Sequence, residues 1–561
     1  MARGDAAAAA ALFGEPGYWR DLIALTWNIR TFEDRASIAA MLDAALPTAQ
    51  PTGWALSEPA TRSERTVQAW LRFETATGRG TGLLRLRDGK AWTLLTALTE
   101  LKGHEEKQGP TREQGTQHGA FRHRRNWRQR REEEAAELGT TVQPYCLIVG
   151  GGQGGLGLGA RLKRLGVPTL IVDRLERPGD AWRRRYDSLC LHDPVWYDHM
   201  PYLPFPEHWP VFTPKDKMGD WLESYCTIME LDYWSSTECR SASYDEAAGE
   251  WTVEVLRDSA PVTLRPKHLV LATGMSGVPK TPVIPGAGTF AGTLHHSSAH
   301  RGGAGWEGRN CVVVGSNNSA HDIAADLWEH DANVTMVQRS PTLVVRSETL
   351  GQLATRRLYS EEALAEGMTT GRADFTVASV PFAVQPDLQR PVYEQVRQQD
   401  ADFYAKLEAA GFLLTFGEDE AGLSTMYMRR GSGYYIDVGA SELISDGRIG
   451  LRSGVEPVEI RPGGLVLNDG EELPADLIVF ATGYGSMNGW AAELISQDVA
   501  DRVGKCWGLG SGTKLDPGPW EGELRNMWKP TAQDGLWFHG GNLAQSRFYS
   551  RILALQLKAR F

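Results

Sequence analysis

The chain has 561 residues, of which 42% are hydrophobic and 23% are charged, a composition typical of globular proteins with two to four domains. The net charge of −11 argues against general nucleic-acid binding, which favours basic surfaces. No apolar run is long enough to cross a membrane, and the first residues lack the pattern of a signal peptide. Six scattered cysteines without a C-x-x-C pair argue against a disulfide scaffold or a metal site. We therefore expect a cytoplasmic protein with no nucleic-acid or membrane partner.

Residues 1–105 are expected to form a separate, small α+β unit. Ala6 to Phe13 has the composition of a helix end, and a second helix is predicted over Ser37 to Ala45. Three runs that alternate polar and apolar residues follow at 66–74, 81–87 and 91–101, which predicts strands. This order of helix and curved sheet resembles the NTF2-like domain. Such domains form ligand pockets or serve packing and dimerisation, and we favour the second role, with a homodimer as the expected assembly.

Residues 106–143 are predicted to be a charged helical linker. Six arginines stand between positions 122 and 131, and three glutamates follow at 132–134. Arg128–Glu132 and Arg130–Glu134 have the i, i+4 spacing of ion pairs along a helix. A solvated helix laid across the main domain is the favoured interpretation, and a patch that binds anions or nucleic acid is the alternative.

Residues 145–173 have the order of a dinucleotide-binding unit. An apolar run at 145–149 predicts a buried strand, and Gly150, Gly152 and Gly155 follow with the spacing G-x-G-x-x-G. In this motif the glycines allow a tight turn, close approach of a pyrophosphate and close packing of the helix, whose N-terminus faces the phosphates. Asp173 ends the next apolar strand, where a carboxylate accepts hydrogen bonds from ribose hydroxyls.

A second unit of the same kind is predicted to begin at Cys311. After an apolar strand, residues 315–320 read Gly-Ser-Asn-Asn-Ser-Ala, a degenerate motif with Asn317 at the middle glycine position. Arg339 ends the following strand, where the first unit has an acid. Arginine at this position suits a 2′-phosphate, so this unit is predicted to prefer NADPH. The alternative is an ordinary surface arginine.

With both motifs and Phe480-Ala-Thr-Gly-Tyr484 in view, residues 144–561 resemble the class B flavin-dependent monooxygenases. This group includes the flavin-containing monooxygenases, the YUCCA enzymes and the Baeyer–Villiger enzymes. Residues 191–194, Leu-His-Asp-Pro, and 436–439, Ile-Asp-Val-Gly, are similar to the YUCCA branch. The family linker F-x-G-x-x-x-H-x-x-x-Y/F is matched at Phe290, Gly292 and His296, but its last position is His300.

The resemblance implies an α/β fold with two Rossmann-like dinucleotide-binding domains, the NADPH domain inserted in the FAD domain. We expect an NTF2-like domain at 1–105 and a linker at 106–143. The FAD-binding domain is expected to be split between residues 144–285 and 485–561. The NADPH-binding domain is expected at 286–484, with a helical insert at 345–445. The implied activity is NADPH-dependent insertion of one atom of O₂ into a small organic substrate, through a C4a-(hydro)peroxyflavin.

The resemblance also assigns candidate site residues. For FAD these are Gly150, Gly152, Gly155 and Asp173, with Ala181, Trp182 and His192 lining the flavin. For NADPH they are Ser316, Asn317, Asn318, Ser319 and Arg339. Further cofactor contacts are expected from Gln153, Arg174, Gly315, Thr482, Gly483 and Asn542, the last at the start of a helix suited to stabilise a reduced flavin. Asn318 and His296 are the candidate catalytic residues, and His296 as a hinge hydrogen bond is the favoured alternative.

The sequence leaves the substrate open among sulfides, amines, ketones and 2-oxo acids. Baeyer–Villiger oxidation of a ketone is therefore one alternative. A flavoprotein that senses redox state or recruits partners without turnover is another. A disulfide reductase with two dinucleotide sites is disfavoured, because it needs two neighbouring cysteines beside the flavin.

Overall fold

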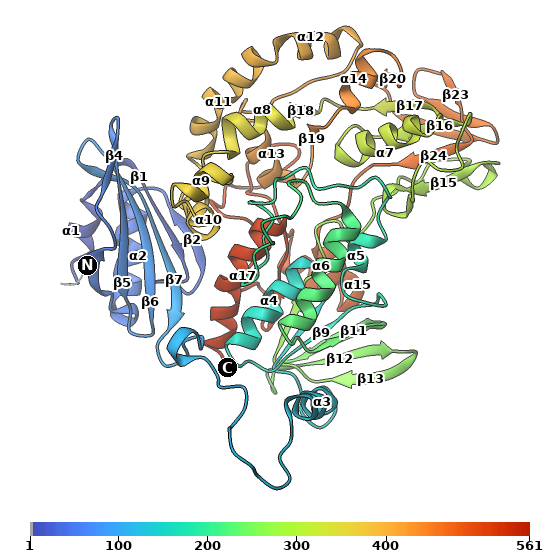
Figure 1. Cartoon of the computed structure of the whole chain (residues 1–561). Coiled ribbons are helices and arrows are strands. Elements are labelled where there is room, and N and C mark those ends of the chain that lie inside the picture. The colour runs from blue at the N-terminus through green and yellow to red at the C-terminus, as the bar shows by residue number, and fades with distance from the viewer. Residues whose placement is uncertain (1–3) are drawn as a thin grey trace.

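The computed structural model describes residues 4–561, and the N-terminal unit, residues 4–101, is a curved sheet backed by two helices (Figure 1). Its strands run in the order β2-β1-β7-β6-β5-β3, with β4 paired to β5, and only β1 and β7 are parallel. The elements are α1 (Ala6–Ala10), β1 (Phe13–Leu22), β2 (Ile29–Phe32), α2 (Arg35–Ala49), β3 (Thr52–Leu56), β4 (Thr61–Ser63), β5 (Thr66–Glu74), β6 (Gly78–Arg87) and β7 (Lys90–Leu101).

The expected helix end at Ala6 to Phe13 is corrected by the structure. The helix stops at Ala10, and Phe13 already begins β1. Gly14, Pro16 and Gly17 follow at once, and these residue types disfavour a helix interior. Burial of the Phe13 side chain, which is 3% exposed, stabilises the strand instead.

The first nucleotide unit is built on a parallel sheet of order β10-β9-β8-β14-β25. Its central strands are buried at every position and apolar apart from Thr169 and His268, as expected where helices cover both faces of a parallel sheet. Its elements are β8 (Cys146–Val149), α4 (Gln153–Arg164), β9 (Thr169–Val172), α5 (Asp180–Arg183), α6 (Lys215–Ile228), β10 (Tyr233–Trp234), β14 (His268–Leu271), β25 (Leu536–Phe538) and α17 (Leu543–Lys558), with a side sheet of β11 (Thr237–Asp245), β12 (Glu250–Arg257) and β13 (Ala260–Leu264).

The second nucleotide unit has a parallel sheet of order β15-β24-β16-β17-β20. In the sequence it interrupts the first unit, so an α/β fold with two dinucleotide-binding sheets is confirmed. Its elements are β15 (Thr293–His296), β16 (Asn310–Val314), α7 (Asn318–Glu329), β17 (Asn333–Gln338), α14 (Ala440–Ser445), β20 (Gly450–Ser453) and β24 (Leu477–Phe480), with a side sheet of β21 (Pro457–Arg461), β22 (Gly464–Leu467) and β23 (Glu472–Pro474).

Residues 343–437 form the insert, which two parallel strands bound. β18 (Leu343–Arg346) pairs with β19 (Tyr434–Asp437), and six α-helices lie between them in the chain. These helices are α8 (Ser347–Leu350), α9 (Glu361–Ala365), α10 (Thr370–Ala378), α11 (Gln385–Gln399), α12 (Ala401–Ala409) and α13 (Leu423–Arg430). Two further helices, α15 (Asn488–Leu494) and α16 (Gln497–Val503), follow the second unit.

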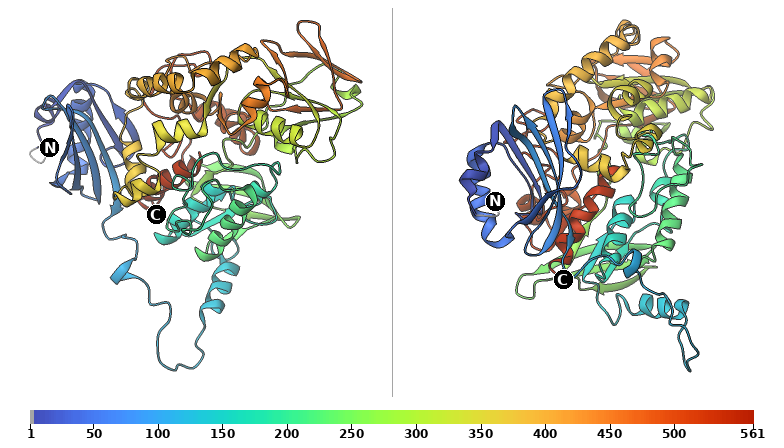
Figure 2. Two further views of the ribbon diagram at one scale, coloured as in Figure 1. Left: turned by 45° about the horizontal axis from the view of Figure 1, so that its top comes forward. Right: turned by 60° about the vertical axis from the view of Figure 1, so that its left-hand side comes forward.

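The N-terminal unit packs against the main body rather than hanging from its linker (Figures 1 and 2). Helix α10 of the insert contacts α17, and its Phe375 also meets Trp70 of the N-terminal sheet at 5.3 Å between ring centroids. The linker extends away from the main body as a long loop that includes α3 (Trp127–Glu137) (Figure 2). Within residues 4–561, no helix combines the length and apolar character needed to span a bilayer.

Candidate active site

The glycine-rich turn after β8, residues 150–155, lies at the carboxyl end of the first sheet and is called the first cradle below. Gly150 has φ of +110°, and a Cβ added there would lie 2.4 Å from the Ala272 carbonyl oxygen. A Cβ on Gly155 would lie 1.9 Å from the Gly150 carbonyl oxygen, so the helix can pack this closely only on glycine. A Cβ on Gly152 would meet no atom within 4 Å, so this backbone is open to a ligand. The Gly151 N–H donates to Asp173 at 2.6 Å.

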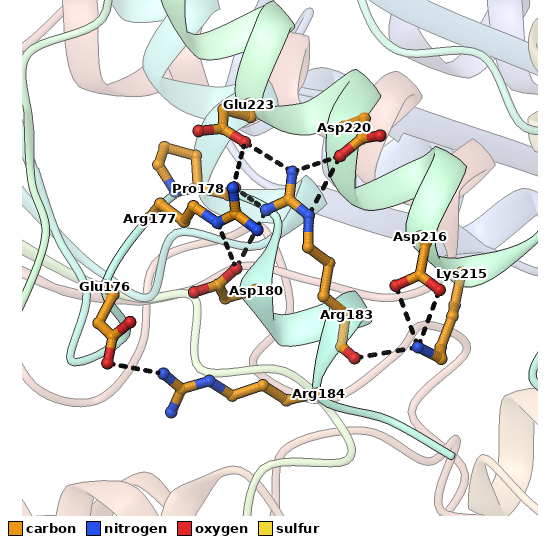
Figure 3. A network of polar contacts seen from close by, with 10 residues as sticks. All are labelled: Glu176, Arg177, Pro178, Asp180, Arg183, Arg184, Lys215, Asp216, Asp220 and Glu223. Atoms are coloured by element: carbon orange, nitrogen blue, oxygen red, sulfur yellow. Dashed lines mark hydrogen bonds and ion pairs between the residues drawn. The ribbon is translucent and has the colours of Figure 1, made fainter. Parts of the chain in front are cut away.

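Helix α5 carries Ala181, which is exposed, and Trp182, which contacts the first turn of α4. Its Arg183 donates to Asp180, Asp220 and Glu223 at 3.0, 2.9 and 2.6 Å, and the last two belong to α6 (Figure 3). This network fixes α5 to α6. Trp182 Nε1 then donates to Gln153 Oε1 at 3.2 Å.

Helix α17 begins on the other side of the cradle. Asn542 caps it, since Asn542 Oδ1 accepts from the Gln545 N–H at 2.9 Å and the Gln545 side chain accepts from the Asn542 N–H. Asn542 Nδ2 also donates to the Tyr197 hydroxyl at 2.9 Å. Arg547, one turn further on, donates to both oxygens of Asp374. The start of α17 is therefore fixed in position.

The second cradle repeats this arrangement at the carboxyl end of β16. Gly315 has φ of +136°, and an added Cβ would lie 2.4 Å from the Ala481 carbonyl oxygen. Asn317 stands at the N-cap of α7 without a side-chain capping bond. The Ser316 and Thr342 hydroxyls are 2.7 Å apart. Arg339 extends into solvent, with its side chain 75% exposed.

Asn318 and Ser319 occupy the first turn of α7. Asn318 Oδ1 accepts from the Ile436 N–H of β19 at 3.0 Å, so this side chain already supports the edge of the insert. Ser319 precedes Asp322, which accepts from the Tyr186 hydroxyl at 2.7 Å. Asp322 Oδ1 also lies 3.4 Å from His192 Nε2. Burial lowers the pKa of His192, but the hydrogen bond and charge of Asp322 outweigh this effect, so its pKa lies above the ordinary value.

His296 lies where the two nucleotide units join. Its Nε2 is 3.0 Å from the Gly483 carbonyl oxygen, and its Nδ1 accepts from the Ser298 N–H at 3.1 Å. The Gly483 carbonyl also accepts from the Lys280 N–H, and the Thr482 hydroxyl donates to the Lys280 carbonyl at 2.6 Å. Both imidazole nitrogens therefore have partners within the junction. Arg174 lies outside this junction. Its side chain is exposed, and its Cζ lies 6.0 Å from the centroid of the Trp490 ring.

The first cradle contains polar atoms that a dinucleotide would satisfy. The Thr273 hydroxyl, the Ser546 hydroxyl and both His539 nitrogens are buried and lack a hydrogen-bond partner among the described residues. His539 and Ser546 lie near Gly154, and Thr273 follows β14 beside Gly150. Unsatisfied buried polar groups indicate a missing partner. Together with the open Gly152 backbone, they fit FAD, and the Gly315 turn with exposed Arg339 fits NADPH.

Some site residues carry no local sequence signal. Tyr197, Asp322 and Tyr427 reach the site through contacts with α17 or with His192. Tyr427 comes from α13, and its hydroxyl is 3.2 Å from Gln545 Oε1. No motif or spacing identifies these residues, because their contacts join elements far apart in the chain.

Comparison with known proteins agrees with the two cradles. The family described as pyridine nucleotide-disulphide oxidoreductase matches residues 147–380. The indole-3-pyruvate monooxygenase YUCCA1 of Oryza sativa subsp. japonica is 30% identical over 379 residues, which cover 66% of this chain and 84% of that protein. The probable indole-3-pyruvate monooxygenase YUCCA1 of Arabidopsis thaliana is 31% identical over 350 residues, which cover 61% and 75%.

A solved structure shares the fold. Cyclohexanone monooxygenase with bound ε-caprolactone aligns with a TM-score of 0.51 at 17% identity, over 74% of this chain and 87% of that one. All six cysteines of the present chain are free, so no disulfide lies beside the first cradle. The chain belongs to the flavin-containing monooxygenase family and is an FAD- and NADPH-dependent oxidoreductase, a flavin monooxygenase.

Proposed function

We propose that this monooxygenase acts on a small organic substrate with a carbonyl group, and that 2-oxo acids are the class to test first. The observation that carries the proposal is the pair of glycine cradles joined by the hydrogen bond between His296 and Gly483. The substrate class follows from the relatives, which are named for indole-3-pyruvate, a 2-oxo acid. Oxidation of a ketone in the Baeyer–Villiger manner is the second candidate.

In this proposal, residues 150–155 and the α4 N-terminus hold the FAD pyrophosphate and Asp173 holds the ribose. Bound FAD supplies the chemistry that activates O₂, and NADPH supplies the hydride. Residues 315–319 and Arg339 bind NADPH, with Arg339 on the 2′-phosphate. Trp182 and His192 would line the flavin, and the Asn542-capped start of α17 would favour negative charge on a group bound beside it. Gln153, Arg174, Ala181, Thr482 and Gly483 complete the proposed set of cofactor contacts.

The roles proposed for the two catalytic candidates are positional. Asn318 keeps β19 against α7 through its bond to the Ile436 N–H. His296 pins the hinge at Gly483. Burial lowers the pKa of His296, so near neutral pH this ring is uncharged and its Nε2–H donates to the Gly483 carbonyl.

The proposal is tested by measuring NADPH oxidation and O₂ uptake with matched panels of 2-oxo acids, ketones, sulfides and amines. A 2-oxo acid, R-CO-COOH, would react with O₂, NADPH and H⁺ to give R-COOH, CO₂, NADP⁺ and H₂O. Substrate-dependent NADPH loss with one CO₂ released per NADPH supports the proposal. Faster NADPH loss with ketones, with ester as product, supports the second candidate. A yellow protein whose NADPH oxidation no panel accelerates would instead be a redox-sensing flavoprotein.

We further propose that residues 1–105 are an NTF2-like domain, that residues 106–143 are its linker, and that the FAD- and NADPH-binding domains meet at about residues 285 and 485. The seven-stranded curved sheet with α1 and α2 on one face supports the NTF2-like assignment for residues 4–101. We propose a cytoplasmic homodimer, with neither nucleic acid nor a membrane as partner. Light scattering after size-exclusion chromatography tests the dimer, and a mass of one chain, 61.8 kDa, contradicts it.

A further inference from the structure

Helix α10 lies between the N-terminal sheet and α17 (Figure 1). Its Arg372 donates to both oxygens of Glu58 in the N-terminal unit, at 2.9 and 2.8 Å, and lies over the Trp70 ring at 4.6 Å. Two residues later, and so on nearly the opposite side of the helix, both oxygens of Asp374 accept from Arg547 of α17 at 2.7 and 2.8 Å. One helix therefore links the N-terminal unit to α17.

The Asp374–Arg547 pair is buried and holds a loop of the first nucleotide unit. The two side chains are 5% and 8% exposed, and the Tyr359 hydroxyl also donates to Asp374 at 2.9 Å. Arg547 Nη1 donates to the carbonyl oxygens of Tyr197 and His199 at 2.8 and 2.6 Å. A buried guanidinium depends on its carboxylate partner. Asp374 therefore fixes Arg547, and Arg547 in turn fixes residues 197–199.

The parts that Arg547 fixes touch the first cradle. The Tyr197 hydroxyl accepts from Asn542 Nδ2 at 2.9 Å, at the N-cap of α17. Gln153 Nε2, in the first turn of α4, donates to the Gly541 carbonyl oxygen at 3.5 Å, directly before this cap. The position of Arg547 therefore sets how the start of α17 lies against the glycine turn.

The N-terminal unit holds α10 at further points. The Phe375 ring of α10 packs on Trp70, with 5.3 Å between the ring centroids. Arg20 donates to the Ala378 carbonyl at the end of α10 and to the Tyr549 hydroxyl of α17. With nine residues, α10 is too short to be a stable helix by itself. Its position therefore depends on the elements that pack against it, and the N-terminal sheet is one of them.

We propose that Asp374 is a positioning residue for the flavin, and that the N-terminal unit acts through it to complete the FAD site. This inference rests on the placement of FAD at the first cradle and is independent of the substrate class. The docked N-terminal unit holds α10, Asp374 on α10 holds Arg547, and Arg547 holds the start of α17 beside the glycine turn. Loss of any of these links lets the start of α17 move and weakens the binding of FAD.

The first test separates positioning from stability. The full chain is freed of flavin and titrated with FAD, and its unfolding in urea is measured in parallel. We expect Asp374→Asn to lose stability and to bind FAD at least about 10-fold more weakly. The double variant Asp374→Leu/Arg547→Met removes both buried charges, so it should regain most of the stability. It should not regain the affinity, because the Tyr197 and His199 carbonyls have lost their donor. If the double variant regains both, or if Asp374→Asn binds FAD like the wild type, the role is purely structural and the proposal fails.

The second test addresses the N-terminal unit. Arg372→Met removes the contacts with Glu58 and Trp70 and should weaken FAD binding at least about 3-fold. Arg390→Met on α11 is the matched control, because the hydrogen bonds of Arg390 stay within the insert, and its FAD affinity should equal that of the wild type. Equal affinity in Arg372→Met and Arg390→Met overturns the part assigned to the N-terminal unit.

The third test uses reciprocity, since a unit that strengthens FAD binding must itself be held more firmly when FAD is bound. Hydrogen–deuterium exchange of the wild type should slow at residues 57–60 and 370–378 on addition of FAD, and protection confined to the first cradle contradicts the proposal. Gly152→Ala separates this inference from the placement of FAD. If Gly152→Ala loses FAD affinity and Asp374→Asn does not, this inference fails while the placement stands. If Gly152→Ala binds FAD as tightly as the wild type, the placement is wrong and this inference fails with it.

Discussion

The buried ion pair between Arg20 and Glu523 should determine how firmly the N-terminal unit is docked. Arg20 Nε and Nη2 donate to the two Glu523 oxygens at 2.6 and 2.7 Å, and both side chains are nearly inaccessible, at 2% and 4%. Arg20 also donates to the Ala378 carbonyl and to the Tyr549 hydroxyl on α17. The substitution Arg20→Met leaves the Glu523 carboxylate buried, with the Thr31 hydroxyl as its one remaining side-chain donor among residues 4–561. Breaking such a pair costs about 3–5 kcal/mol.

Urea unfolding followed by circular dichroism, with limited proteolysis in the 106–143 linker, measures this cost. We expect Arg20→Met to unfold at lower urea and to release the N-terminal unit to protease. The double variant Arg20→Met/Glu523→Leu should recover most of the loss, because no buried charge remains. Arg65→Met is the control, since the Arg65–Asp88 pair is 83% and 73% exposed and should matter little. If Arg20→Met behaves like Arg65→Met, the docked interface does not exist in solution.

Three further predictions concern the cofactor sites. Gly155→Ala should lose both bound flavin and stability, because its methyl group would press on the Gly150 carbonyl. Gly152→Ala should keep the wild-type unfolding midpoint but bind FAD at least about 10-fold more weakly. Parallel losses of stability in both variants would contradict this prediction. Arg339→Gln should raise KM for NADPH by about 10-fold or more and leave KM for NADH unchanged, and steady-state kinetics showing both KM values rising together would refute the 2′-phosphate role. His296→Ala should lower stability by about 1 kcal/mol and slow turnover at full flavin content, and an unchanged kcat would exclude a hinge role.

The two dinucleotide units could be predicted from the sequence because their signals are local. A buried strand, a glycine turn and a helix stand within about 30 residues, and the turn geometry at Gly150 and Gly315 admits few residue types. The strands at 66–74, 81–87 and 91–101 were predictable for the same reason, since alternation is a property of neighbours. Strand β1, which pairs with β7 across about 75 residues, was missed because Gly14, Pro16 and Gly17 interrupt its pattern.

Contacts between residues far apart in the chain could not be predicted from the sequence. The Arg20–Glu523 pair joins residues 503 positions apart. The loop at 191–198 is linked to the two cradles through the contacts of His192 with Asp322 and of Tyr197 with Asn542. The motif Leu191-His192-Asp193-Pro194 was visible as a family signature, but these two contacts were not. Pairing and its absence depend on three-dimensional surroundings that spacing along the chain does not encode.

The sheet of the first nucleotide unit has a consequence for how the chain folds. Its strands β14 and β25 pair at Leu269 and Leu536, with the entire second nucleotide unit between them in the chain. Closing a loop of that length before any contact forms is slow for a flexible chain. We expect the second unit to fold first, around its own hydrophobic core, and so to bring the ends of this long loop together. We therefore expect the second unit to act as a folding scaffold for the first sheet, and damage to its core to be detected first as lost flavin rather than as lost NADPH affinity.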